Sequence, residues 1–128
     1  MSYFYTKTHE WLQHLSGDTY RVGISEYAVE KLGDVTLVDG EELSQGETFK
    51  PDDMLLPIES VKSVGEIYAP VAGMVVMVNP ALEDAPELVN SSPLGDGWIL
   101  EIKVTDVEEI ASRLMTEDQY REYLNTQD

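Results

Sequence analysis

Alternation of apolar and polar residues along the chain predicts a protein built mainly of short strands. The clearest case is residues 98–104, where Glu101 and Lys103 lie on the face opposite the apolar side chains. Those apolar side chains are Trp98, Leu100, Ile102 and Val104. The other segments with β character are 3–5, 19–24, 35–38, 54–58, 66–69 and 74–78. Because glycines and prolines separate these segments, we predict a small antiparallel sandwich or flattened barrel, in one domain that spans residues 1–128.

A short internal helix is predicted directly after the second of these segments. Ser25 is a suitable N-cap, and Ala28 and Leu32 share one face of the helix that would follow. Gly33 supplies a left-handed stop. One brief helix should therefore interrupt the strands.

The C-terminal region carries two further signals for the start of a helix. Asp106 with Glu109, and Thr116 with Gln119, have the spacing of capping boxes. Apolar side chains recur on one face after each signal. They are Val107, Ile110 and Leu114 after the first signal, and Tyr120, Tyr123 and Leu124 after the second. We expect C-terminal helices that pack against the sheet.

The charge balance limits the partners of the chain. Its 128 residues include 8 Lys and Arg against 25 Asp and Glu, for a formal net charge of −17. Such a chain repels phosphate backbones and anionic lipid, which argues against nucleic acid and membrane surfaces as partners. A partner that is steered by charge should present a basic face.

Composition and motifs also argue against several chemistries. The chain has no cysteine, so disulfides, thiolate catalysis and Cys-based zinc sites are impossible. It lacks the G-x-S-x-G, P-loop, G-x-G-x-x-G and H-E-x-x-H motifs, and its two histidines, His9 and His14, are five residues apart. The acidic pairs at 41–42, 52–53 and 83–84 lie in polar stretches typical of solvated loops. We therefore expect neither an enzyme nor a metal site.

No segment predicts secretion or membrane insertion. The longest uncharged, mostly apolar run, residues 69–78, is far shorter than the ~20 residues of a membrane helix. Residues 1–8 lack the apolar core of a signal peptide. We expect a cytoplasmic protein, or one of the mitochondrial matrix where a presequence has been removed.

One lysine stands out in this acidic chain. Residues 57–70 read PIESVKSVGEIYAP, and Lys62 lies in the tight link between two segments with strand character. A hairpin there would turn its side chain outward. Position alone does not distinguish Lys62 from an ordinary solvated lysine.

The residues around Lys62 resemble the lipoyl-attachment hairpin of the H proteins of the glycine cleavage system. The matching segments there are 59–62 (ESVK), 67–73 (IYAPVAG) and 75–79 (VVMVN). Others follow in family order, namely 5–11 (YTKTHEW), 22–24 (VGI), 32–35 (LGDV), 86–90 (PELVN) and 95–98 (GDGW). The resemblance thus runs along nearly the whole chain.

The resemblance implies a mainly β fold, the barrel-sandwich hybrid, with Lys62 at an exposed hairpin tip. Lipoic acid would be joined to the lysine amine through an amide, which removes the charge and leaves a long flexible arm. Glu59, Ser60, Val61 and Gly73 belong to the motif that is recognised for attachment. Such an arm suits a carrier whose sulfur must enter the buried sites of several enzymes.

The resemblance also implies a cleft in which the loaded arm docks. Thr8 and Glu10 stand at the Ser/Thr-His-Glu-Trp positions of the family, and Glu66 occupies the acidic place four residues after the lysine. The amine of an aminomethyl group should be cationic near neutral pH, so carboxylates in a partly dry cleft would hold it. The alternative is that Glu10 is a solvated strand residue and Glu66 a polar side of the hairpin.

The implied partners are the enzymes of one cycle. The arm would collect the aminomethyl group at a glycine decarboxylase that uses pyridoxal phosphate, and yield it to an aminomethyltransferase that uses tetrahydrofolate. Dihydrolipoamide dehydrogenase would reoxidise the dithiol, and a lipoyl-attaching enzyme would install the arm. The family suggests a monomeric carrier that changes no bond itself.

Departures from the family pattern keep a second function open. Residues 39–43 (DGEEL) stand where the family usually has Leu-Pro-x-x-Gly, 50–53 resemble a small insertion, and Gly65-Glu66 replaces the usual Ser-Asp pair. The alternative is an H-like protein that relays lipoate to other enzymes or serves other sulfur chemistry. Biotin carriers fit less well, because they place methionines on both sides of the lysine, and lipoyl domains of 2-oxo acid dehydrogenases normally place Asp before it.

Overall fold

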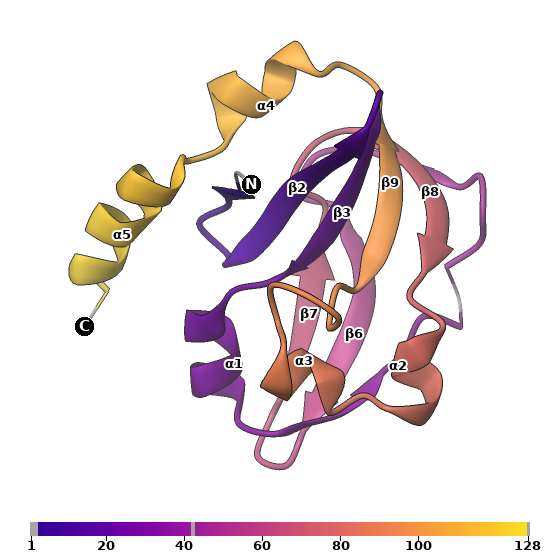
Figure 1. Cartoon of the computed structure of the whole chain (residues 1–128), viewed down its shortest axis with the longest axis vertical. Coiled ribbons are helices and arrows are strands. Elements are labelled where there is room, and N and C mark those ends of the chain that lie inside the picture. The colour runs from indigo at the N-terminus through magenta and orange to yellow at the C-terminus, as the bar shows by residue number, and fades with distance from the viewer. Residues whose placement is uncertain (1–2, 42, 128) are drawn as a thin grey trace.

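The computed structural model describes residues 3–41 and 43–127. Within them the chain forms nine strands and five short helices (Figure 1). The strands are β1 (Tyr3–Tyr5), β2 (Glu10–Ser16), β3 (Thr19–Ile24), β4 (Val35–Val38), β5 (Thr48–Phe49), β6 (Met54–Ser60), β7 (Val64–Tyr68), β8 (Gly73–Val78) and β9 (Leu100–Val104). The helices are α1 (Glu26–Leu32), α2 (Ala81–Asp84), α3 (Leu88–Ser91), α4 (Glu108–Arg113) and α5 (Glu117–Asn125).

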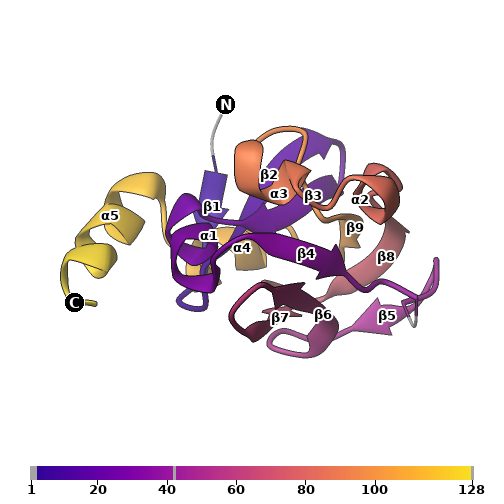
Figure 2. The same cartoon turned by 90° about the horizontal axis from the view of Figure 1, so that it is seen from below.

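Two antiparallel sheets make up a flattened barrel. The larger has the strand order β1-β2-β3-β9-β8-β5, and the smaller has the order β4-β6-β7. Figure 2 shows β4, β6 and β7 on one side, β2, β3, β9 and β8 on the other, and α5 outside at one end. The prediction of a small antiparallel β protein with a short internal helix and C-terminal helices is confirmed.

The inner faces of the sheets share one apolar core. Val22 on β3, Ile58 on β6 and Ile102 on β9 are each almost fully buried. A second cluster contains Tyr5 and Tyr120, whose stacked rings have centroids 4.2 Å apart. Burying a side chain of this size contributes about 1.5–3 kcal/mol, so this second cluster fixes α5 to the N-terminal strands.

Local signals in the sequence correctly placed several elements. All predicted strand segments overlap strands, and Leu100, Ile102 and Val104 are buried while Lys103 is exposed. The Ser25 side chain caps α1 by accepting a hydrogen bond from the amide of Ala28. The helix ends at Gly33, which has a φ of 83°.

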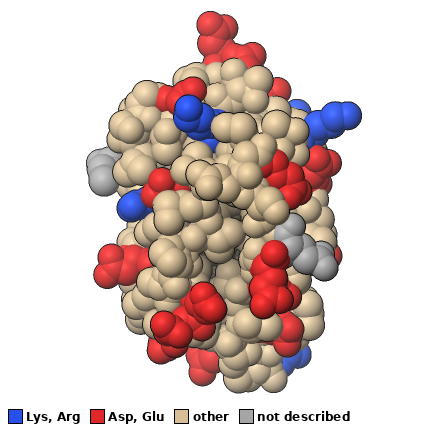
Figure 3. Space-filling model, turned by 90° about the vertical axis from the view of Figure 1, so that its right-hand side faces the viewer, with Lys and Arg blue, Asp and Glu red and all other residues tan. Residues whose placement is uncertain are grey.

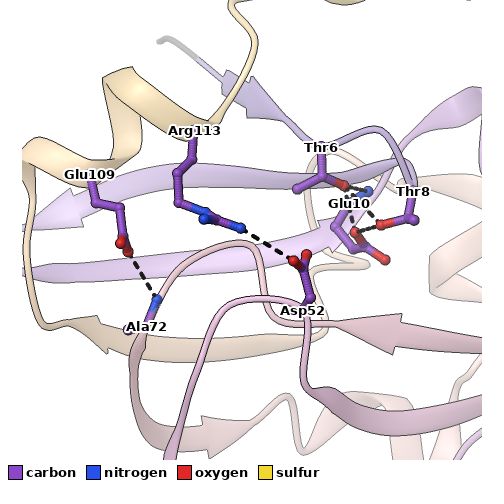
Figure 4. A network of polar contacts seen from close by, with 7 residues as sticks. All are labelled: Thr6, Thr8, Glu10, Asp52, Ala72, Glu109 and Arg113. Atoms are coloured by element: carbon purple, nitrogen blue, oxygen red, sulfur yellow. Dashed lines mark hydrogen bonds and ion pairs between the residues drawn. The ribbon is translucent and has the colours of Figure 1, made fainter.

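The two C-terminal capping boxes have different outcomes. Thr116 and Gln119 form the predicted box at the start of α5. The box predicted for Asp106 and Glu109 is wrong, because the Asp106 carboxylate accepts the amide of Glu108 rather than that of Glu109, and the Glu109 carboxylate accepts the amide of Ala72 (Figure 4). This tertiary contact takes the carboxylate that a box would need.

Four elements were not predicted. They are β2, β5, α2 and α3. The acidic pair 83–84, expected in a loop, lies in α2. Among the described residues, no helix is long and apolar enough to cross a membrane.

Candidate functional site

Lys62 lies at the tip of the hairpin formed by β6 and β7, as predicted. Glu59 and Val64 are the last pair of the antiparallel ladder, and the amide of Ser60 donates to the carbonyl of Ser63 over 2.9 Å. Residues 61–63 are exposed, and Figure 1 shows the hairpin reaching beyond the helices at the bottom of the view. The side chain of Lys62 is therefore accessible to a large partner.

The hydroxyl of Ser60 organises the turn. Its oxygen lies 2.6 Å from the carbonyl of Leu32, to which it donates, and it accepts the amide of Ser63 over 3.1 Å. The amide of Lys62 also points at this oxygen, at 3.4 Å. The carbonyl of Ser63 lies 3.0 Å from it as well. A single hydroxyl thus contacts four backbone groups and anchors the tip to the end of α1.

The end of α1 supports the turn from below. The amide of Val61 donates to the carbonyl of Asp34 over 3.0 Å. The aliphatic stem of Lys62 lies over Gly33, where a Cβ would come 3.1 Å from the lysine Cε. A glycine suits this position for two reasons: it adopts the positive φ at the helix end, and it leaves space for the lysine stem.

The surroundings of the lysine amine are open. No described carboxylate forms an ion pair with the Lys62 amine. Val61 and Val64, on either side of the tip, are each 69% exposed. Glu59 is exposed, and its carbonyl accepts a hydrogen bond from Thr36 on β4. The tip thus presents one free cation between two apolar side chains.

Glu10 lies in a buried polar site at the start of β2. It is only 1% exposed, which contradicts the alternative of a solvated strand residue. Its Oε1 accepts hydrogen bonds from the hydroxyls of Thr6 and Thr8 (Figure 4). Its Oε2 accepts the backbone amide of Tyr68 over 3.2 Å. Both carboxylate oxygens therefore have partners inside the protein.

Burial raises the pKa of the Glu10 carboxyl above its ordinary value. The hydrogen bonds from Thr6, Thr8 and Tyr68 oppose this change by stabilising the charged form, without cancelling it. Burial thus destabilises the negative charge of Glu10, and a cation nearby would stabilise that charge.

Tyr68 connects the three residues predicted for the docking cleft. Its amide binds Glu10, which binds Thr8, and its hydroxyl donates to Glu66 over 2.7 Å. That bond to Glu66 is the main reason why the pKa of Tyr68 is raised. Sequence reasoning did not select Tyr68, although its position two residues after Glu66 on the same strand face was a usable signal.

The loop before Glu10 is held by the C-terminal helix. His9 has a positive φ of 74°, and its Nδ1 lies 2.8 Å from the hydroxyl of Tyr120 on α5. That hydroxyl is also 2.7 Å from the Ser25 hydroxyl, and Tyr123 donates to the carbonyl of Lys7. Burial lowers the pKa of His9. Residues of α5 therefore fix the loop that carries Thr8.

Gly73 lies in the other sheet, at the start of β8, where it pairs with Phe49 and Val104. A Cβ at this position would clash with the backbone oxygen of Lys103. Its place in the fold is a close approach between β8 and β9, away from the ladder that ends at Lys62.

No metal site accompanies these groups. Within residues 3–41 and 43–127, no three His, Cys, Asp or Glu side chains are arranged to hold a metal ion. The groups described above that could serve a chemical role are the lysine amine, the carboxylates of Glu10 and Glu66, and the hydroxyls around these carboxylates.

Comparison with known proteins agrees with this geometry. Residues 3–127 match the family model described as glycine cleavage H-protein. The chain is 48% identical over 127 residues to a probable glycine cleavage system H protein of Thermococcus kodakarensis, with 96% of this chain and 90% of the relative covered. It is 50% identical over 110 residues to the glycine cleavage system H protein of Cronobacter sakazakii, with 86% and 84% covered.

A solved structure supports the same assignment. The crystal structure of a glycine cleavage system H protein from Mycobacterium marinum superposes with a TM-score of 0.83 at 33% identity, and 96% of each chain is covered. The flattened barrel-sandwich fold expected for a lipoyl carrier is thereby confirmed. The chain belongs to the glycine cleavage H-protein family.

Proposed function

We propose that the chain is the lipoyl carrier of a glycine cleavage system, with lipoic acid joined to Lys62 through an amide. The observation that carries the proposal is the lysine itself, exposed at the tip of a hairpin whose backbone is fixed by Ser60. Family membership supplies the system in which such a lysine acts.

The residues at the tip fit the attachment of an acyl group. The Lys62 amine makes no ion pair with any described carboxylate, so acylation breaks no such contact. The exposed side chains of Val61 and Val64 offer an attaching enzyme apolar contacts beside the amine. When bound, lipoate supplies a disulfide that accepts an aminomethyl group from a pyridoxal-phosphate glycine decarboxylase and yields it to a tetrahydrofolate-dependent aminomethyltransferase.

The polar site around Glu10 is where we place the cationic amine of the carried group. Glu66 is exposed and fixed by the Tyr68 hydroxyl, while Glu10 lies behind the backbone of Tyr68 as a buried negative charge. β7 runs from the tip to Tyr68, and at a rise of about 3.3 Å per residue this end lies about 13 Å from Val64. A long arm bends back along one strand to reach it.

In this proposal the chain serves other enzymes and catalyses no step itself. Its partners are the decarboxylase, the aminomethyltransferase, dihydrolipoamide dehydrogenase and a lipoyl-attaching enzyme, and we place the protein with them in the cytoplasm. The net charge of −17 favours contact faces on these enzymes that are basic.

The test has two stages. The protein is treated with lipoate and a lipoate ligase, and intact mass should show one lipoyl increment on the wild type and on Lys103→Arg, but none on Lys62→Arg. A guanidinium remains protonated and has no free amine lone pair to acylate. Lipoylated protein should then support exchange of carbon dioxide with glycine by the decarboxylase. Lipoylation without exchange would instead favour the lipoate-relay function.

A further inference from the structure

We propose that a pocket between β4 and α2 binds an arginine side chain of a protein partner. The pocket is lined by the end of β4, residues 39–41, the end of β8 and the first residues of α2. β4 pairs with β6 so that Val35 lies opposite Ser60 near the tip, whereas Val38 lies further back, opposite Ile58. The pocket is therefore at the end of β4 away from Lys62, and the proposal does not depend on lipoylation.

The pocket has room for a long side chain together with the residue next to it, and its walls suit an aliphatic stem. Its volume is about 470 Å³. Leu37, Val78 and Leu82 provide apolar walls, and Leu37 remains 43% exposed. Gly40 closes the wall by approaching Val78, since a Cβ at Gly40 would come 3.0 Å from the valine methyl groups. An aliphatic stem would gain contacts on several sides here.

Three carboxylates belong to the pocket lining. Asp39 and Glu41 lie on the segment after β4, and Glu83 lies on α2. Asp39 accepts the amide of Glu41 over 3.2 Å, which orders this turn. In the part of the chain that the structure describes, none of the three forms an ion pair with Lys or Arg. Figure 3 shows the side of the molecule with β8 and α2, where red carboxylates predominate over blue cations.

Apolar walls combined with carboxylates match an arginine better than a metal ion. No three carboxylate or His side chains of the described residues are arranged for a metal ion, here or elsewhere. A guanidinium carries its charge at the end of an apolar stem, is weakly hydrated, and donates to two carboxylates at once. An apolar residue next to the arginine would cover the exposed face of Leu37.

The wall of the pocket is built from the segment where this sequence departs from the usual family pattern. Asp39 and Gly40 stand in place of the Leu and Pro of that pattern, and Glu41 follows them. This segment brings two carboxylates and a close-packed glycine to the pocket. We therefore assign the site to a partner of this chain rather than to the attachment reaction at Lys62.

The test is a nuclear magnetic resonance titration of the full, unlipoylated chain with acetyl-Leu-Arg-amide. We expect saturable shifts of the amides of Gly40, Glu41 and Leu82, with a dissociation constant on the order of 1 mM. The matched probe is acetyl-Leu-citrulline-amide, which has the same shape without the charge and should cause no saturable shift. Glu41→Gln combined with Glu83→Gln should weaken binding roughly five- to tenfold, as expected for two partly exposed ion pairs.

A matched control keeps the same loss of charge away from the pocket. Glu122→Gln on α5, combined with Glu108→Gln on α4, should bind the arginine peptide as the wild type does. Equal shifts with arginine and citrulline, shifts spread over the whole acidic surface, or equal weakening by the control pair would overturn the proposal. Absence of any saturable shift would overturn it as well, whatever the outcome of lipoylation at Lys62.

Discussion

The amide of Tyr68 donates to the buried carboxylate of Glu10 over 3.2 Å, although 58 positions separate the two residues in the chain. Glu10 begins β2 in the larger sheet and Tyr68 ends β7 in the smaller one, so this bond ties the two sheets together. Because Thr6 and Thr8 satisfy the other oxygen, the carboxylate is fixed before any ligand arrives. A cation that docks near Glu10 therefore meets a negative charge that folding has already removed from water and fixed in position.

Replacing Glu10 with Gln should shorten the lifetime of the loaded carrier. The amide keeps a hydrogen-bonding side chain at this position but removes the negative charge that stabilises a nearby ammonium. Lipoylation of Lys62 should be unchanged, because Glu10 lies at the opposite end of β7 from the tip. The measurement is the release of ammonia and formaldehyde from the aminomethylated protein, with Glu122→Gln as the charge-matched control. Identical release rates for both variants would contradict a role for Glu10.

The same variant isolates a dependence of stability on pH. The pKa of Glu10 is raised from 4.5 by burial, so the folded protein binds this proton more tightly than the unfolded chain does. The corresponding stability is fully present below pH 4.5 and is lost as the pH rises through the folded pKa. The free energy of unfolding of the wild type should therefore fall, relative to that of Glu10→Gln, as the pH increases from 4.5. Urea unfolding at stepped pH checks this, and a constant difference would contradict it.

The burial of residues around Glu10 also explains why the sequence pattern did not predict β2. Its first four residues are all buried, and two of them, Glu10 and Gln13, are polar. A strand that is covered on both faces does not alternate, because one side of β2 meets the core and the other meets the aromatic cluster of Trp11. Period-two patterning had no signal to detect there.

Whether the other elements and site residues could be predicted depends on how far apart in the sequence the interacting residues lie. The caps at Ser25 and Thr116 are local, so three neighbouring residues were enough to predict them. α2 and α3 have four residues each, which is too short for an apolar periodicity to show. The start of α2 does carry a local signal that was not used, because Asn79 precedes Pro80 and its side chain accepts the amide of Ala81. The position of Lys62 followed from its hairpin, whereas the link through Tyr68 depends on a contact between sheets that no local pattern specifies.

Tyr120→Phe should loosen α5 and the loop that carries Thr8. The ring can stay stacked on Tyr5, but the hydrogen bonds to His9 and Ser25 are lost. Leaving the buried hydroxyl of Ser25 and the half-buried ring of His9 without this partner should lower the free energy of unfolding by about 1–3 kcal/mol. Urea unfolding measures the loss, and amide exchange of residues 6–9 should accelerate. Tyr123→Phe, which removes one exposed bond to the carbonyl of Lys7, is the milder control. Equal stability of wild type and Tyr120→Phe would contradict the assigned role.

Gly73→Ala should act on folding rather than on recognition by an attaching enzyme. The new methyl group would meet the backbone oxygen of Lys103, which cannot move without shifting β9. We expect a loss of roughly 1–3 kcal/mol in the free energy of unfolding, as for overpacking of a tight site. The rate of lipoylation per folded molecule should equal that of the wild type. A slower rate in a variant of unchanged stability would instead place Gly73 in the recognised motif.

Ser60→Ala should slow lipoylation without abolishing it. The Ser60 hydroxyl donates to the carbonyl of Leu32 and accepts the amide of Ser63, so its removal frees the tip from the end of α1. The Lys62 amine is unchanged, but the turn that carries it can then adopt several conformations. We expect the free energy of unfolding to fall by about 0.5–1.5 kcal/mol, the net value of a typical hydrogen bond. Intact-mass kinetics with a lipoate ligase measure the attachment rate, and hydrogen exchange of residues 60–64 measures the turn.

Ser63→Ala is the matched control for Ser60→Ala, because the Ser63 hydroxyl has one weak contact, 3.3 Å from the Ser60 hydroxyl. Both variants remove the same atom from the same turn, yet only the first cuts the anchor to Leu32. If the turn must be held rigid for attachment, Ser60→Ala should be slow and Ser63→Ala should match the wild type. Equal rates in all three proteins, with faster exchange in Ser60→Ala alone, would show that an attaching enzyme accepts Lys62 from a mobile turn and that the anchor serves stability only.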